Sequence, residues 1–192
     1  MEERDRMTNA PTLASRRRFL GLGAAALSFP FLSRLSAFAA PETLPPDRGL
    51  SFYNTHTGES ATVEYCHSGC LIPLSLEKIN HILRDHLTGE TKDIDVRLLD
   101  LLYALSRKIS TDEPFHVISG YRSPRTNAAL RAGGGGVAAN SLHLLGQAID
   151  IRVPGLKLRD LYRAAVALHG GGVGIYPASD FVHVDVGRVR TW

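Results

Sequence analysis

The stretch Ser141–Asp150, SLHLLGQAID, places a histidine and an aspartate on either side of a glycine and runs on into the strand-forming segment IRVP. We expect a strand over residues 146–153, because β-branched residues favour strands and the glycine disfavours a helix. Seven residues separate His143 from Asp150, and an odd separation on one flat strand points two side chains to opposite faces. His143 instead precedes the strand, in a turn that can swing its imidazole over the strand end. The sequence therefore predicts that these two side chains meet.

A third group is expected on the segment DFVHVDVG, residues 180–187, near the C-terminus. Alternation along this strand gives an apolar valine face and places His183 on the other face. Two imidazoles and one carboxylate suit zinc, which in catalytic sites keeps a fourth position for water. Such an ion makes water acidic enough to attack near neutral pH. His143, Asp150 and His183 are therefore candidate zinc ligands, and ordinary buried hydrogen-bonded roles are the alternative.

A zinc hydrolase also needs a general base, and two aspartates flank His183 on the predicted strand. Asp180 lies three residues before the histidine, and Asp185 lies two residues after it. Either carboxylate could take a proton from water. Asp185 could instead orient the imidazole of His183, as carboxylates beside metal-bound histidines do. The residues alone leave this choice open.

The N-terminal segment has the features of an export signal. It reads SRRRFLGLGAAALSFPFLSRLSAFA, with paired arginines (Arg16 and Arg17), a short apolar run and a small-x-small pattern that ends at Ala39. This order resembles a twin-arginine signal peptide. The apolar run is shorter than the ~20 residues of a membrane span, so we expect cleavage rather than a stable membrane anchor. Residues 1–39 are then the signal, 40–49 a proline-rich lead-in, and 50–192 one domain.

The expected mature chain carries no net charge. The whole sequence has 22 basic and 19 acidic residues, and the signal holds six arginines and three acidic residues, which leaves 16 of each. A balanced charge without a basic stripe does not favour nucleic-acid binding. Two cysteines remain, Cys66 and Cys70. In an oxidising compartment they could form a disulfide or stay as thiols.

The remaining pattern predicts an α+β domain, with helices packed on a small antiparallel sheet. Two strand-forming runs around a His-Thr-Gly-Glu turn predict a hairpin over residues 50–65. Ser75 is a candidate cap of an amphipathic helix, and a second such helix is expected from Asp95. Further expected elements are a strand at 115–119, a short helix at 127–131, a helix at 156–169 and a strand at 173–176.

Three segments, SGYRS, SLHLLGQAID and DFVH, together resemble the S-x-H-x-x-G-x-A-x-D and (E/D)-x-x-H signature of the D-Ala-D-Ala metallopeptidase group. That group includes hedgehog-type domains and murein endopeptidases. SFYNTHTGE, VISGYRSPRTN and FVHVDVGRVRTW extend the likeness to the exported murein endopeptidases, so it covers nearly all of residues 50–192. The resemblance implies a hedgehog-like fold, and zinc-dependent hydrolysis of peptidoglycan stem-peptide crosslinks, of the L,D type between diaminopimelate residues. Together with the twin-arginine-type signal of residues 1–39, it implies a periplasmic protein that is exported by the twin-arginine machinery.

The resemblance also implies roles for individual residues. It makes His143, Asp150 and His183 the zinc ligands, and it puts Asp180 at the position of the group's acidic base. Arg122, in GYRS, matches an arginine near the scissile carbonyl, where a fixed cation would stabilise the developing oxyanion. A surface salt bridge is the alternative for this arginine. Ser141 is expected to support the ligand turn by hydrogen bonding, or to be an ordinary turn serine.

Three other interpretations remain at the level of sequence. The enzyme could be a carboxypeptidase that trims stem peptides. If neither Asp180 nor Asp185 reaches the water, the domain would bind zinc and murein without hydrolysis. Ser68-Gly69-Cys70 follows the order of the nucleophile segment of L,D-transpeptidases, with His56 or His67 as base, but the arginine expected after that cysteine is missing.

Overall fold

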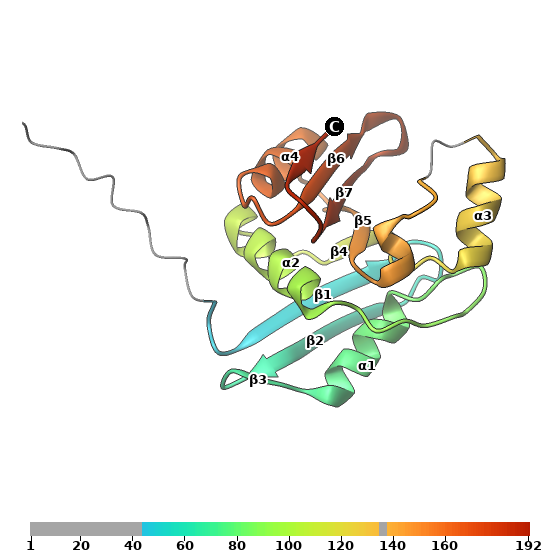
Figure 1. Ribbon diagram of the computed structural model, residues 1–192. Coiled ribbons are helices and arrows are strands. Elements are labelled where there is room, and N and C mark those ends of the chain that lie inside the picture. The colour runs from blue at the N-terminus through green and yellow to red at the C-terminus, as the bar shows by residue number, and fades with distance from the viewer. Residues whose placement is uncertain (1–43, 135–137) are drawn as a thin grey trace, which may run out of the picture. The chain divides into compact units, whose positions relative to one another are not determined.

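The computed structural model describes residues 44–134 and 138–192, which form four α-helices and one eight-stranded sheet (Figure 1). The predicted signal peptide, residues 1–39, and the first part of the lead-in lie outside the described residues. The elements are β1 (Arg48–Asn54), β2 (Ser60–His67), β3 (Cys70–Leu71), α1 (Pro73–Ile82), α2 (Val96–Ile109), β4 (Phe115–Ser119), α3 (Pro124–Ala132), the 3₁₀ turn η1 (Leu142–Leu145), β5 (Ala148–Arg152), α4 (Leu158–Val166), β6 (Gly172–Tyr176), the 3₁₀ turn η2 (Pro177–Ser179), β7 (Phe181–Asp185) and β8 (Arg190–Thr191).

The strands follow the order β3-β2-β1-β4-β5-β7-β6-β8, and most neighbours are antiparallel. Two pairs, β1 with β4 and β6 with β8, are parallel. Parallel neighbours need a long crossover connection, and the chain between β1 and β4 supplies one that contains α1 and α2. The predicted α+β class is confirmed, with a sheet that is mixed.

The predicted hairpin forms, with Leu50 of β1 opposite Val63 of β2. Apolar side chains of the strands pack with those of the helices in one core. In β5, Ile149 and Ile151 enter the apolar core, while Asp150 between them is also buried but points to the other face of the sheet. The core therefore fixes the side of the sheet on which polar residues of β5 and β7 gather.

The first helix begins earlier than the sequence predicts. Helix α1 starts at Pro73, after Ile72 in an extended conformation that makes no side-chain cap hydrogen bond. Proline suits this first position because its missing N–H would have no partner there and its φ is already helical. Ser75 lies inside the first turn, so its predicted role as the cap is wrong. The predicted start of α2 near Asp95 is confirmed, and the Asp95 side chain caps this helix by accepting from the N–H of Arg97.

Two turns of the same construction lie beside β4, at residues 54–59 (NTHTGE) and 85–90 (DHLTGE). In each, the first side-chain oxygen accepts two backbone N–H groups, and the first carbonyl accepts the N–H of a glycine with positive φ. The imidazoles of His56 and His86 stack, with ring centroids 3.8 Å apart. The second turn is tied to the start of α3, because the N–H of Ser123 donates to its aspartate.

The two cysteines are both free thiols, with Cys66 buried and Cys70 exposed. Cys66 donates to the carbonyl of Pro46 at 3.3 Å. Within the ranges that the structure describes, no helix combines the length and the apolar composition that crossing a membrane requires.

Candidate metal centre

Two of the predicted ligands face each other across a strand pair. Strands β5 and β7 run antiparallel, and their register sets Asp150 directly opposite His183. Residues that are directly opposite in an antiparallel pair point to the same face, so both side chains leave the sheet together. His143 approaches from η1, the turn that leads into β5. The structure thus brings all three predicted ligands to one place, where His143 and Asp150 are buried.

The turn that carries His143 has the backbone shape that SLHLLGQAID requires. Ser141 precedes it in an extended conformation, and its hydroxyl accepts from the N–H of His143 at 3.4 Å. Gly146 ends it with φ of 67°, in the left-handed region that favours glycine. A Cβ at this glycine would also collide with the carbonyl oxygen of Asp93. The glycine therefore permits both the turn and its close packing against the chain before α2.

The three ligand atoms lie at distances that fit one ion. His143 Nε2 is 3.2 Å from His183 Nδ1 and 3.3 Å from Asp150 Oδ1. His183 Nδ1 and Asp150 Oδ1 are 2.8 Å apart. Zinc bonds of 2.0–2.1 Å in a tetrahedral shell give edges of about 3.3 Å. These side chains could therefore close around a zinc ion with little movement.

The outer nitrogen of each imidazole already has an acceptor. His143 Nδ1 lies 2.7 Å from the carbonyl oxygen of Gly120, and His183 Nε2 lies 3.0 Å from Asp185 Oδ2. An N–H on each outer nitrogen satisfies these contacts and leaves the inner nitrogens with lone pairs that face each other. Two facing lone pairs repel unless a cation or a proton lies between them, and metal-bound histidines are commonly held in this way.

The ligand atoms of His183 and Asp150 can bind protons as well as a metal ion. Burial lowers the pKa of His183, but its hydrogen bonds to Asp150 and Asp185 outweigh burial, so the net pKa is raised. Burial also acts to raise the pKa of Asp150, yet the nearby His143 and His183 hold that pKa well below its ordinary range. A divalent cation that entered this site would meet a charged carboxylate and would displace a proton.

Asp185 lies on the outer side of His183 and is fully buried. Besides the imidazole, it accepts from the guanidinium of Arg190 at 2.7 and 3.0 Å and from the N–H groups of Gly172 and Gly187. Burial raises its pKa, but these donors together hold the pKa well below the usual range. With both oxygens engaged behind the imidazole, Asp185 is placed to orient His183 rather than to take a proton from water.

Arg122 joins the centre from the segment after β4. Its Nη2 lies 3.5 Å from Asp150 Oδ2 and 3.2 Å from the hydroxyl of Ser119, and its backbone N–H donates to the carbonyl of His143. The side chain is almost entirely buried. The interpretation of this arginine as an ordinary surface salt bridge does not fit a buried contact with a ligand carboxylate.

Asp180 lies at the rim, just before β7, and is exposed. Its backbone has φ of 52°, and its carboxylate pairs with Arg152 at 3.1 Å. Arg152 shares strand β5 with Asp150 and projects from the same face. The structure therefore places Asp180 at the exposed rim of the polar face, paired with Arg152, and shows no hydrogen bond between it and the three ligand side chains.

Three contributors to the centre were not predicted from sequence. They are the carbonyl of Gly120, the guanidinium of Arg190, and the ring of Trp192, which lies 5.3 Å from the His183 ring between centroids. Arg190 and Trp192 belong to the closing segment GRVRTW, and their nearness in sequence to His183 was the available signal. The contact made by the Gly120 carbonyl could not be predicted, because the pattern of side chains does not show where a backbone carbonyl points.

A second group of possible ligands, Asp47, Glu64 and His67, lies on the exposed edge of the sheet. His67 Nδ1 is 3.0 Å from Glu64 and 3.3 Å from Asp47, and hydrogen bonding to Glu64 is the main cause of its raised pKa. Hydrogen bonding and ion pairing of His67 with these two solvated carboxylates explain this group without a metal.

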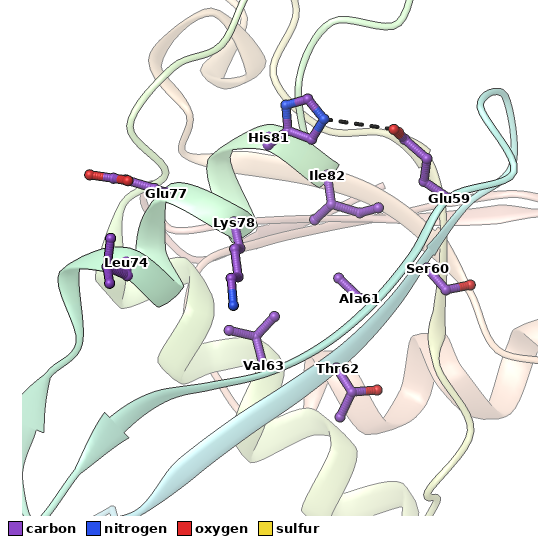
Figure 2. Close-up of a pocket in the computed structure, with 10 residues that line it drawn as sticks. All are labelled: Glu59, Ser60, Ala61, Thr62, Val63, Leu74, Glu77, Lys78, His81 and Ile82. Atoms are coloured by element: carbon purple, nitrogen blue, oxygen red, sulfur yellow. Dashed lines mark ion pairs between the residues drawn. The ribbon is translucent and has the colours of Figure 1, made fainter.

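A groove of about 740 Å³ lies between β2 and α1, and its lining includes none of the predicted site residues (Figure 2). Lys78 extends across it toward Val63, and His81 pairs with Glu59 at 3.7 Å at one end. The chemistry-bearing residues lie elsewhere, around β5 and β7.

The chain is similar to known proteins over most of its length. Residues 42–192 match a peptidase family model described as "Peptidoglycan L,D-endopeptidase MepK". The chain is 44% identical to the peptidoglycan L,D-endopeptidase MepK of Escherichia coli K12 over 179 residues, which cover 93% of this chain and 97% of that protein. It is 37% identical to a probable peptidoglycan L,D-endopeptidase MepK of Haemophilus influenzae, over 93% of this chain and 95% of that protein.

Proposed function

Because this chain belongs to the peptidoglycan L,D-endopeptidase MepK family, we propose that it cleaves L,D-amide crosslinks between the stem peptides of peptidoglycan, with zinc held by His143, Asp150 and His183. Membership makes the chain a peptidase of the metallopeptidase class. One observation supports the metal most strongly: three ligand atoms from η1, β5 and β7 converge within 2.8–3.3 Å of one another. The outer imidazole nitrogens are occupied, so the inner ones are directed at a shared position.

When bound, zinc supplies Lewis-acid chemistry that polarises a carbonyl and makes water a stronger acid. The protein's own residues provide the rest. Asp180 takes a proton from the attacking water and passes it to the amine nitrogen that leaves. To do so its carboxylate turns from Arg152 toward the ligand face, which its solvent exposure permits. Arg122, anchored by Asp150 and Ser119, directs positive charge toward the oxygen of the scissile carbonyl, where negative charge develops.

The choice of Asp180 over Asp185 as the base follows from their surroundings. Asp185 is buried behind His183 and accepts five hydrogen bonds from four residues. Asp180 is exposed at the rim of the ligand face and has one ion pair to release. Asp185 then acts as the positioning residue of His183.

The proposal extends to the place of action. A peptidoglycan substrate and the Arg16–Arg17 signal together support export by the twin-arginine route and work in the periplasm. Replacing both arginines by lysine is expected to leave uncleaved precursor in the cytoplasm. Normal export of that variant, measured by cell fractionation, would contradict the route and leave the enzymatic proposal intact.

The activity is tested on purified peptidoglycan digested with the zinc-loaded protein, with the muropeptides identified by mass spectrometry. Dimers with L,D crosslinks are expected to become monomers, chelation to stop the reaction and zinc to restore it. Asp180→Asn is expected to lower kcat by about 10²–10⁴-fold. Asp160→Asn is the matched control, because Asp160 is also an exposed aspartate paired with an arginine, Arg163 at 3.6 Å. Trimmed stem peptides with intact crosslinks would instead indicate a carboxypeptidase, and equal rates for both variants would remove Asp180 as the base.

A further inference from the structure

Three aromatic side chains form a continuous shelf beside the metal centre. Trp192 lies next to His183, with ring centroids 5.3 Å apart and planes inclined by 46°. Its Nε1 donates to the hydroxyl of Tyr176 at 2.8 Å, and Tyr176 stacks on Phe181 with centroids 4.6 Å apart. Trp192 and Tyr176 are 46% and 38% exposed. Large aromatic rings beside a buried polar centre are thus open to solvent.

Within this shelf, Trp192 is held in place by contacts on several sides. The guanidinium carbon of Arg190 lies 4.8 Å from the centroid of the Trp192 ring, and the same guanidinium binds Asp185. Gly174 lies directly against the indole, where any Cβ would collide with the ring. The backbone of Trp192 exchanges two hydrogen bonds with β6. A side chain fixed on this many sides loses little freedom when a ligand contacts it.

The exposed part of the shelf favours packing against apolar groups. The indole N–H is already satisfied by Tyr176, so what Trp192 offers to solvent is ring surface. Rings of this size gain most from packing against carbon-rich groups that leave water. A substrate segment that touches Trp192 also lies beside His183, so it belongs to a residue adjacent to the scissile bond and not to a distant part of the substrate.

We propose that Trp192, Tyr176 and Phe181 form a substrate subsite that packs against the methylene chain of the diaminopimelate residue next to the scissile amide. The inference rests on the proposed function, because that function supplies the substrate. Diaminopimelate joins two polar amino-acid ends by a run of methylene groups, and those groups are the apolar part of the crosslink nearest the reacting bond. The shelf binds this segment while Arg122, and the zinc that the ligand residues would hold, face the amide.

Kinetics of three variants on purified L,D-crosslinked muropeptide dimers test the subsite. Trp192→Ala is expected to raise KM about tenfold and to change kcat by less than about threefold, whereas Trp192→Phe keeps most of the affinity because a ring remains. Leu74→Ala is the matched control, since Leu74 is 70% exposed in the groove beside α1, and its KM should not change. Zinc content is measured for each variant. An unchanged KM for Trp192→Ala, equal effects of Ala and Phe, or loss of zinc from Trp192→Ala would overturn the subsite.

A second measurement uses the unaltered chain and so does not depend on the folding of a variant. The sequence contains a single tryptophan, so intrinsic tryptophan fluorescence reports on Trp192 alone. Adding the dimer to zinc-loaded protein is expected to shift the emission, with saturation near the KM. An unchanged spectrum in a sample that cleaves the dimer would overturn the subsite and leave the proposed function standing. A saturable shift without cleavage would support the subsite and contradict the proposed function, and neither shift nor cleavage would contradict both.

Discussion

The contact between His183 and Asp185 shows how one residue outside the ligand set shapes the centre. Asp185 fixes the ring by accepting from Nε2 at 3.0 Å, and Arg190 and two backbone N–H groups fix Asp185 in turn. The ring is thereby oriented with Nδ1 toward Asp150 and His143. Orientation of this kind lowers the cost of binding an ion, because the ligand need not be reorganised.

Asp185→Ala is therefore expected to weaken zinc affinity by about 10–100-fold, since the imidazole loses its orienting acceptor. The measurement is a competition titration with a chromophoric chelator. His143→Ala should show no site-specific binding, and Asp160→Asn should bind as the wild type does. An Asp185→Ala protein of unchanged affinity would show that the strand pair alone orients the ring.

Arg122 has a role that lysine should not fill. Its Nη2 contacts both Asp150 and Ser119, so an ammonium in that place would have one donor left, whereas the rigid guanidinium keeps further N–H groups on Nε and Nη1. Arg122→Lys is expected to lower kcat by about 10²–10³-fold with unchanged zinc content, and Arg125→Lys, an exposed arginine three residues away, should have no effect. Loss of zinc in parallel with activity would show that Arg122 serves to hold Asp150 instead.

Among the elements, the 85–90 turn carries a buried charge that supports the segment around Arg122. Burial raises the pKa of Asp85, but hydrogen bonds from Thr126, Ser123 and Leu87 outweigh burial and hold the pKa well below its ordinary value. A depressed pKa in the folded state stabilises the protein above the unfolded-state pKa of about 3.9, and that contribution is lost as the pH falls toward the folded value.

Asp85→Asn is expected to lower the free energy of unfolding by about 1–3 kcal/mol near neutral pH, because the charge-assisted contacts are lost. The difference from wild type should shrink when the pH falls below about 4, where the wild-type carboxylate is also neutralised in the unfolded chain. Urea unfolding at both pH values measures this. If the two proteins differ by the same free energy of unfolding at both pH values, the hydrogen-bond geometry of residue 85, and not its charge, supports the turn.

The elements also show which features local sequence can predict. The β1–β2 hairpin, the start of α2 near Asp95 and the turn that carries His143 are set by residues close in the chain, and each prediction is confirmed. The start of α1 was wrong because a serine within the first turn was chosen over the proline that begins the helix. The 85–90 turn repeats the 54–59 turn, but its partner at Ser123 is far along the chain and could not be predicted from local pattern.

For the whole molecule, the parallel neighbours β1 with β4 and β6 with β8 were not predicted, since each pair joins strands that at least one other strand separates in the sequence. The metal centre was more accessible to sequence, because alternation alone placed Asp150 and His183 on polar strand faces. Its supporting contacts come from outside the ligand strands: the Gly120 carbonyl follows β4, and Trp192 reaches His183 from a closing segment that hydrogen-bonds to β6.

Zinc should stabilise the whole domain, because its ligands come from η1, β5 and β7 and are together only in the folded chain. At a zinc concentration about 1,000 times its Kd, the added stability is about 4 kcal/mol. Thermal unfolding with and without zinc should show a clear rise in Tm for the wild type and none for His143→Ala. An equal rise in both proteins would point to binding elsewhere on the chain.

The cross-strand position of Asp150 and His183 has a consequence for how the chain finds its native pairing. Sliding β7 by a single residue against β5 would turn the imidazole to the opposite side of the sheet, away from the carboxylate. Only the correct alignment can then share an ion, so binding of zinc at the proposed site would stabilise the native register of β5 and β7 over a shifted one.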